Sequence, residues 1–295
     1  MRLPARLASV AAAAGLLIGW AVPAQPAGAS MASVLAGPSG RSGPSGIRAP
    51  GAAVENAATG HVLWSRALDT RRPMGSITKV MTALVVIRAG GLGRTLRVPA
   101  AAVSYARAHG ASSAGLWAGD RLTTRQLLEA LLLPSGCDAA YVLAAAYGPG
   151  LNGFIARMNA LTRQMGLGRT HFSNFDGLPW PAGNSTYSTP ADLLAIGRAA
   201  MGSAVFRGLV DQRSYRLGSG SGHHAYSWAN SNVLLGSYPG VIGIKTGWTG
   251  AAGYCLLFEA RRGSRSLIGV VLDSSATVRS VSFSDARQIL NWGFR

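Results

Sequence analysis

Short apolar runs and longer helical patterns alternate along this 295-residue chain. Near the beginning, two apolar runs flank Ala58-Thr59-Gly60, which predicts a β-hairpin with a glycine turn. Near the end, three further runs are separated by glycines and charged residues, which predicts consecutive antiparallel strands. The expected strands cover residues 52–54, 61–64, 241–246, 254–260 and 267–273.

Helical patterns occupy the segments between and after these runs. Residues 76–89 are apolar nearly all round and stop at Gly90, which predicts a helix buried on every face. Thr123 and Gln126 form a capping-box pattern at the start of a second helix, which Pro134 stops. The remaining helices are expected over residues 135–148, 154–165, 190–201 and 283–292.

The order of these elements predicts an α+β fold: an antiparallel sheet built from both chain ends, with a helical lobe inserted at roughly residues 98–215. Residues 1–29 have the basic start, apolar run and small-residue cleavage site of an export signal; an uncleaved membrane anchor is the alternative. Residues 30–50 are rich in Gly, Ser and Pro, which predicts a flexible tether. The folded domain is then expected over residues 51–295, exported and without a stable transmembrane anchor after signal cleavage.

The chain carries a formal net charge of +17. Nucleic acid is a common partner for such charge, but these arginines are scattered singly, without basic runs or interleaved aromatics. Nucleic acid is therefore not expected as a partner. For an exported protein, the anionic cell envelope is the expected counter-charge.

Lysine is almost absent, because only Lys79 and Lys245 among the 28 lysines and arginines are lysines. A buried lysine can lose its proton near neutral pH, whereas an arginine cannot. Lysine is also a compact point donor, and arginine is a broad planar one. A lysine retained in such a chain indicates a site where a proton moves or where space is tight.

Ser76 and Lys79 are three residues apart at the start of the buried helix, so their side chains share one face. Burial favours the neutral form of Lys79, and a neutral amine beside a hydroxyl is a nucleophile–base pair that needs no histidine. The N–H groups of the helix N-terminus suit a developing oxyanion. The alternative is that Ser76 only caps the helix and Lys79 reaches solvent from its end.

Ser135-Gly136-Cys137 follows the helix-stopping proline. Ser135 and Asp138 have the spacing of an ordinary capping box. Ser135 can also act as a second hydroxyl that relays a proton between Lys79 and a leaving amine. The two roles are compatible, since a capped helix start is a rigid place for a functional side chain.

Lys245-Thr246-Gly247 is expected at the end of a strand. A cation and a hydroxyl on adjacent strand residues can bind a carboxylate, while the strand edge pairs with an extended peptide. Gly247 leaves room for the approach of a backbone, and Lys245 is expected to keep its charge. The alternative is a solvated lysine before a hairpin turn.

Ser-x-x-Lys, Ser-Gly-x and Lys-Thr-Gly in this order are the signature of penicillin-interacting serine enzymes. From Gly51 to the C-terminus the chain resembles the low-molecular-mass D-alanyl-D-alanine carboxypeptidases. The segments that carry this resemblance are MGSITKVMTAL, LLLPSGCDAAYVLA, MNALTRQMGLGRTHF, YSTPADLLAIGRA and GVIGIKTGWTGAAGYCLL. The resemblance implies a β-lactamase/DD-peptidase-like fold with no metal and no cofactor.

The resemblance also implies a mechanism on peptidoglycan stem peptides that end in D-Ala-D-Ala. Ser76 would attack the carbonyl between the two D-alanines, with Lys79 as base and Ser135 returning the proton to the departing D-Ala. The backbone N–H groups of Ser76 and Trp248 match the oxyanion hole of the family. A β-lactam would acylate Ser76 and stay bound.

Substrate binding is implied for the third motif and its surroundings. Lys245 and Thr246 would hold the terminal carboxylate beside Gly247. Arg279 follows the last strand, near where the family has a carboxylate-binding arginine.

Cys137 departs from the family, which usually has Asn as the third residue of the second motif. A thiol donates and accepts hydrogen bonds to a substrate amide more weakly than an amide side chain does. A branch of the family with DD-transpeptidase activity also carries Cys here. Carboxypeptidase, transpeptidase and a β-lactam or muropeptide binding module without turnover therefore all stay open.

Two other enzyme classes are disfavoured by the sequence. A β-lactamase usually needs a dedicated glutamate, and no glutamate lies between the second and third motifs. A thiol enzyme using Cys137 would need a histidine partner, and none lies near it in sequence. Because Cys137 occupies a site position, Cys137 and Cys255 are expected to be two free thiols.

Overall fold

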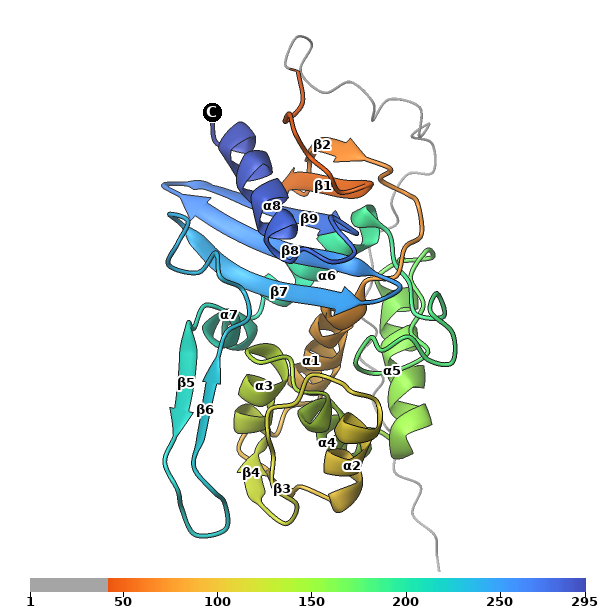
Figure 1. Ribbon diagram of the computed structural model, residues 1–295, viewed down its shortest axis with the longest axis vertical. Coiled ribbons are helices and arrows are strands. Elements are labelled where there is room, and N and C mark those ends of the chain that lie inside the picture. Colours follow the sequence, from red (N-terminus) through yellow and green to blue (C-terminus); the bar gives the residue numbers. More distant parts are fainter. Residues whose placement is uncertain (1–41) are drawn as a thin grey trace, which may run out of the picture. The chain divides into compact units, whose positions relative to one another are not determined.

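An antiparallel sheet of five strands forms one layer of the domain, in the order β2-β1-β9-β8-β7 (Figure 1). The computed structural model describes residues 42–295, so the expected export signal and most of the expected tether lie outside the described residues. The strands are β1 Gly51–Asn56, β2 Val62–Arg66, β7 Val241–Thr249, β8 Gly253–Arg262 and β9 Arg265–Leu272. The predicted hairpin and the predicted three-stranded meander are confirmed.

The two faces of the sheet are covered by different helices (Figure 1). Helix α8 (Ser280–Gly293) packs on β8 and β9, and its apolar side chains join those of the sheet in a buried cluster that includes Phe258 and Ile289. Helix α6 (Pro190–Met201) packs on the opposite face, against β1 and β9. Residues 190–201 were expected in the helical lobe, but this helix contacts the sheet directly.

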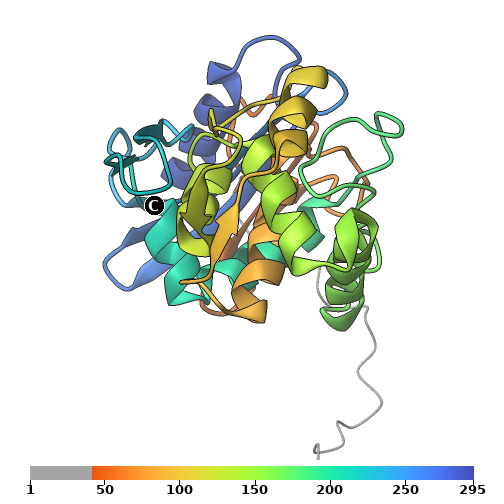
Figure 2. The ribbon, with the colours of Figure 1, turned by 90° about the horizontal axis from the view of Figure 1, so that it is seen from below.

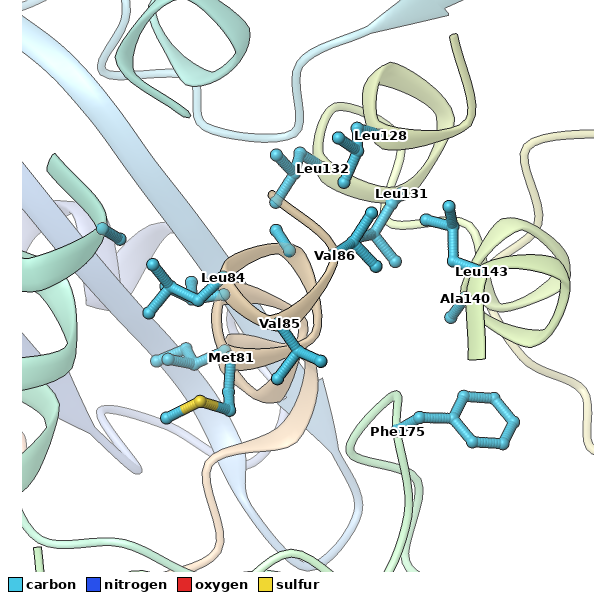
Figure 3. Packing of buried hydrophobic residues seen from close by; sticks show 14 of the residues in the cluster. Met81, Leu84, Val85, Val86, Leu128, Leu131, Leu132, Ala140, Leu143 and Phe175 are labelled. Atoms are coloured by element: carbon cyan, nitrogen blue, oxygen red, sulfur yellow. The ribbon is translucent and has the colours of Figure 1, made fainter. Parts of the chain in front are cut away.

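A helical lobe lies beside the sheet, and Figure 2 views it from below. Its central helix α1 (Thr78–Ala89) is buried from Thr78 to Val86, as the all-round apolar pattern predicts. Figure 3 shows Met81 and Val86 of α1 in a cluster with residues of α3, α4 and Phe175. The other helices of the lobe are α2 Ala100–Ala108, α3 Thr124–Leu132, α4 Cys137–Tyr147 and α5 Gly150–Gln164.

Several short elements complete the described domain. A 3₁₀ turn, η1 (Gly75–Ile77), precedes α1, so the first turn of the expected helix is not α-helical. The others are β3 Thr95–Arg97 paired with β4 Arg121–Thr123, α7 Ala204–Val210, and β5 Ser214–Leu217 paired with β6 Tyr226–Ala229.

The folded domain begins before Gly51, contrary to the expected boundary. The backbone N–H groups of Arg48 and Ala49 donate to the two carboxylate oxygens of Asp285 in α8, at 3.0 and 2.9 Å. Ile47 and Ala49 are buried in the cluster under α8. These residues were expected in a tether because Gly, Ser and Pro surround them, but the hydrogen bonds to Asp285 and the two buried apolar side chains hold the segment on the domain.

No single helix within residues 42–295 is long and apolar enough to cross a membrane. The pair α6 and α7 would meet the criteria of length and composition only if taken together, and the two helices are bent by 103°.

Candidate active site

Ser76 and Lys79 meet at the junction of η1 and α1. The Lys79 side chain is fully buried, and its Nζ donates to Ser76 Oγ at 2.8 Å. The same nitrogen donates to the backbone oxygen of Asp176 at 2.9 Å and to Cys137 Sγ at 3.3 Å. The pairing of serine and lysine that the sequence predicts is present, and no carboxylate oxygen bonds to this nitrogen among the described residues.

The turn that presents Ser76 depends on glycines that let two backbones touch. Gly75 has a φ of +53°, and a Cβ there would lie 2.8 Å from the backbone nitrogen of Trp248. A Cβ on Gly247 would lie 2.3 Å from the carbonyl oxygen of Met74. Strand β7 therefore lies directly against the turn that carries Ser76. Gly247 was expected to leave room for the approach of a backbone, and the backbone that approaches it is that of Met74 in the same chain.

Ser135 does not cap α4, so the expected capping box with Asp138 is wrong. The N-cap is Gly136, and Ser135 has a φ of +70°. The Asp138 carboxylate accepts instead from the backbone nitrogens of Ala114 and Leu116, at 2.9 and 3.1 Å. The Ser135 hydroxyl is left buried without a hydrogen-bond partner among the described residues.

Strand β7 forms one edge of the sheet, and it carries the third motif in its middle rather than at its end. Lys245 is only 1% exposed, and its Nζ lies 3.4 Å from Thr246 Oγ1. Burial is the largest cause that holds the pKa of Lys245 well below its ordinary value, and the nearby Lys79 and Arg279 add to it. The expectation of a strand-end lysine that keeps its charge is not supported by this environment.

A cleft of about 290 Å³ runs along these elements. Ser76, Ser135, Thr246, Gly247, Trp248 and Arg279 are among the residues that line it. The indole of Trp248 is 51% exposed, and the Arg279 guanidinium donates to the backbone oxygen of Ser231. Lys79, Cys137 and Lys245 are buried and are not among the described residues that line this cleft.

A model of one peptidase family, described as D-alanyl-D-alanine carboxypeptidase (peptidase S11), matches residues 39–276. The chain belongs to this family. It is 42% identical over 260 residues to a D-alanyl-D-alanine carboxypeptidase of Streptomyces sp. strain K15, covering 84% of this chain and 88% of that protein. It is 36% identical to a D-alanyl-D-alanine carboxypeptidase of Mycobacterium tuberculosis, covering 80% and 79%.

Solved structures of this peptidase family have the same fold. The Streptomyces K15 DD-transpeptidase superimposes with a TM-score of 0.81 at 42% identity, over 86% of this chain and 99% of that one. A D-alanyl-D-alanine carboxypeptidase from Mycobacterium tuberculosis H37Rv gives 0.76 at 33% identity, over 86% and 92%. The predicted α+β, β-lactamase/DD-peptidase-like fold is confirmed.

Other residues of this family member touch the site but were not predicted. The Tyr105 hydroxyl donates to the Asp176 carboxylate at 3.0 Å, and burial together with Asp176 raises the pKa of Tyr105. Ser231 Oγ lies 2.7 Å from Thr246 Oγ1. Asp176 and Tyr105 follow no pattern that sequence spacing could reveal, because they reach the site from separate loops and helices.

The two cysteines are both buried and free, as predicted. Burial raises the pKa of Cys137 to about 12, with Lys79 opposing and Asp176 adding to the effect. Burial also raises the pKa of Cys255 to about 12, and its thiol donates to the backbone oxygen of Ala252 at 3.3 Å. Both groups therefore stay thiols at neutral pH.

The three glutamates lie away from the cleft. Glu55 pairs with Arg198, Glu129 accepts from Gln212, and Glu259 accepts from Ser266. None of them is among the described residues that line the cleft. This agrees with the expectation that no glutamate serves as a β-lactamase base here.

Proposed function

We propose that this protein is a serine D-alanyl-D-alanine carboxypeptidase that forms an acyl-enzyme on Ser76. Its substrates are peptidoglycan stem peptides ending in D-Ala-D-Ala. The observation that carries the proposal is the 2.8 Å contact between Ser76 Oγ, at the cleft, and the fully buried Lys79 Nζ. A serine with an adjacent amine base is a complete nucleophilic pair.

Acylation begins when Lys79 takes the hydroxyl proton as Ser76 attacks the penultimate D-Ala carbonyl. The backbone N–H groups of Ser76 and Trp248 stabilise the oxyanion, where one donor is typically worth ~3 kcal/mol. Ser135 passes a proton to the departing D-Ala amine. Ser135 is among the residues that line the cleft, and its buried hydroxyl has no hydrogen-bond partner among the described residues, which leaves it available for this role.

The substrate lies along the free edge of β7 as an extra strand. Thr246, held by Ser231, and Arg279 bind its terminal carboxylate. Lys245 lies one residue before Thr246, and its buried Nζ is 3.4 Å from Thr246 Oγ1. In its protonated form it supplies positive potential to the bound carboxylate from behind the residues that line the cleft. The exposed indole of Trp248 covers the peptide at the cleft rim.

The acyl-enzyme is released by water or by an amine. Release by water is the carboxypeptidase reaction. Release by the amine of a second stem peptide is transpeptidation, the second candidate, and it is favoured by the 42% identity with a structure named a DD-transpeptidase. A β-lactam acylates the same serine and remains attached.

The proposed place of action is the cell-wall space. The predicted export signal delivers the chain there, and its net charge of +17 favours the anionic envelope. No stable transmembrane anchor is proposed after cleavage of that signal.

One assay separates the candidate functions. The protein is incubated with a diacetylated tripeptide ending in D-Ala-D-Ala, with and without an acceptor amine such as glycine. Released D-Ala and the cross-linked product are quantified. Free D-Ala without acceptor supports the carboxypeptidase, and product only with acceptor supports the transpeptidase. A β-lactam adduct on Ser76 with neither product would identify a binding module and contradict the proposal.

A further inference from the structure

The two-stranded ribbon of β3 and β4 presents two arginines side by side. Its register pairs Arg97 with Arg121, and it pairs Leu96 with Leu122. Both leucines are buried in the hydrophobic core. Because side chains alternate along a strand, the two arginines lie on the opposite face, where both are exposed. Like charges directly opposite each other on paired strands repel and destabilise the pair.

Two further arginines flank this pair. Arg94 precedes β3, Arg125 lies in the first turn of α3 just after β4, and both are exposed. The two segments are held together, because the N–H of Thr124 donates to the carbonyl oxygen of Arg94 at 2.8 Å. We call Arg94, Arg97, Arg121 and Arg125 the ribbon patch. The ribbon lies at the end of the helical lobe away from the five-stranded sheet (Figure 1).

No carboxylate within residues 42–295 forms an ion pair with the ribbon patch. The two acidic residues nearest to it in sequence are both buried. The Asp120 carboxylate accepts from the Tyr226 hydroxyl at 2.6 Å, and the Glu129 carboxylate accepts from Gln212 at 3.0 Å. Both acids are thus engaged inside the domain, and the patch is left positive toward solvent.

The chemistry of the ribbon patch suits phosphate groups. A guanidinium binds phosphate oxygens through two parallel N–H donors. Thr95 and Thr123 are paired two positions along the ribbon, on the same face as the arginines, and add hydroxyl groups there. The exposed large apolar side chains, such as Trp117 and Trp248, do not belong to the patch. The patch therefore lacks the apolar groups that insert into a bilayer, which favours a polymer in solution over a membrane.

We propose that the ribbon patch is a docking surface for a linear phosphodiester polymer of the cell envelope. One phosphate lies between Arg97 and Arg121 and relieves their repulsion, and Arg94 and Arg125 bind further phosphates of the same chain. None of the four is among the described residues that line the cleft, so a docked polymer leaves the cleft open. The inference rests on the proposed place of action in the cell-wall space.

Binding is tested with end-labelled linear polyphosphate as the probe, by fluorescence anisotropy at several NaCl concentrations. The double variant Arg97→Gln/Arg121→Gln should bind about tenfold more weakly near ~0.1 M NaCl, and the slope of log K against log [NaCl] should fall by about 1.5. The control Arg163→Gln/Arg261→Gln removes the same charge from α5 and β8 and should change the affinity less than about twofold. Equal weakening in both double variants would overturn the proposal, since only net charge would then matter.

Thermal stability gives an independent readout with a sign of its own. Without polymer, the double variant of Arg97 and Arg121 should melt about 1 °C above the wild type, because the repulsion between the paired arginines is removed. With saturating polyphosphate the order should reverse, because the wild type binds the polymer more tightly. A double variant that melts below the wild type in both conditions would show that the arginines support the fold, and it would contradict the proposal.

Two further probes test the class of partner. Vesicles of phosphatidylglycerol and phosphatidylcholine in equal parts represent an anionic membrane, and polyglutamate represents a carboxylate polymer. Binding that depends on the ribbon patch should be tightest for polyphosphate, and tighter binding to either other probe would overturn the assignment. Acylation of Ser76 by benzylpenicillin should be unchanged in the variant of Arg97 and Arg121. Lack of acylation in the wild type would contradict only the proposed activity, whereas polymer binding that is insensitive to the patch would contradict only this inference.

Discussion

Gly247 in β7 lies against Met74 so closely that a Cβ there would be 2.3 Å from the Met74 carbonyl oxygen. A second close contact joins Gly75 to the backbone nitrogen of Trp248, which a Cβ on Gly75 would approach to 2.8 Å. The sheet edge and the turn with Ser76 are thus set by direct backbone packing. The distance between the two proposed oxyanion donors depends on it.

Gly247→Ala should therefore damage catalysis more than folding. The added methyl group forces β7 away from the turn, which displaces the Trp248 N–H from the developing oxyanion. We expect acylation by benzylpenicillin to slow about 100-fold, the effect of losing one such donor. Rapid-quench mass spectrometry measures the rate, and a wild-type rate in this variant would contradict the account.

Ser135→Ala should separate function from stability. The Ser135 hydroxyl is buried without a partner, so its removal costs no hydrogen bond and should change the free energy of unfolding by less than about 0.5 kcal/mol. The proton relay is lost, and D-Ala release should fall about 100-fold. Urea unfolding and the peptide assay check the two expectations, and full turnover in a stable variant would exclude the relay.

Glu129 should make the stability of the protein depend on pH. Its carboxylate is buried in α3, 3.0 Å from Gln212 Nε2, and burial raises its pKa from 4.5 to about 7. The folded state therefore holds this proton more tightly than the unfolded state. The resulting stability is full below pH 4.5 and is lost as the pH rises through about 7.

Glu129→Gln removes this titration. Relative to the wild type, the variant should gain about 2 kcal/mol in free energy of unfolding between pH 5 and pH 8. Urea unfolding of both proteins across this range measures the difference. A difference that does not change with pH would show that Glu129 is not the group responsible.

The sequence predicts the sheet and the buried helix α1 well, because their apolar spacing is long and regular. It does not reveal β3, β4, β5 and β6. Each of these strands is only three or four residues long and includes exposed residues. Such strands are specified by tertiary packing more than by their own pattern. The docking of residues 47–49 on α8 was missed for the same reason.

For the site, the motifs locate the residues but not their environments. The positive φ of Ser135 removes it from the cap that its spacing to Asp138 suggests. The sequence suggests that Lys245 stands at the end of a strand, yet β7 continues past it to Thr249 and its side chain is buried. Asp176 contacts Lys79 from 97 positions away, a separation that no local pattern encodes.

The central claim is that Ser76, with Lys79 as its base, becomes acylated. Intact-mass and peptide mass spectrometry after incubation with benzylpenicillin test it most directly, with Ser76→Ala and Lys79→Arg as matched variants. We predict a single adduct on the peptide containing Ser76 in the wild type and none in either variant. An adduct on another residue, or equal labelling of Lys79→Arg, would contradict the account.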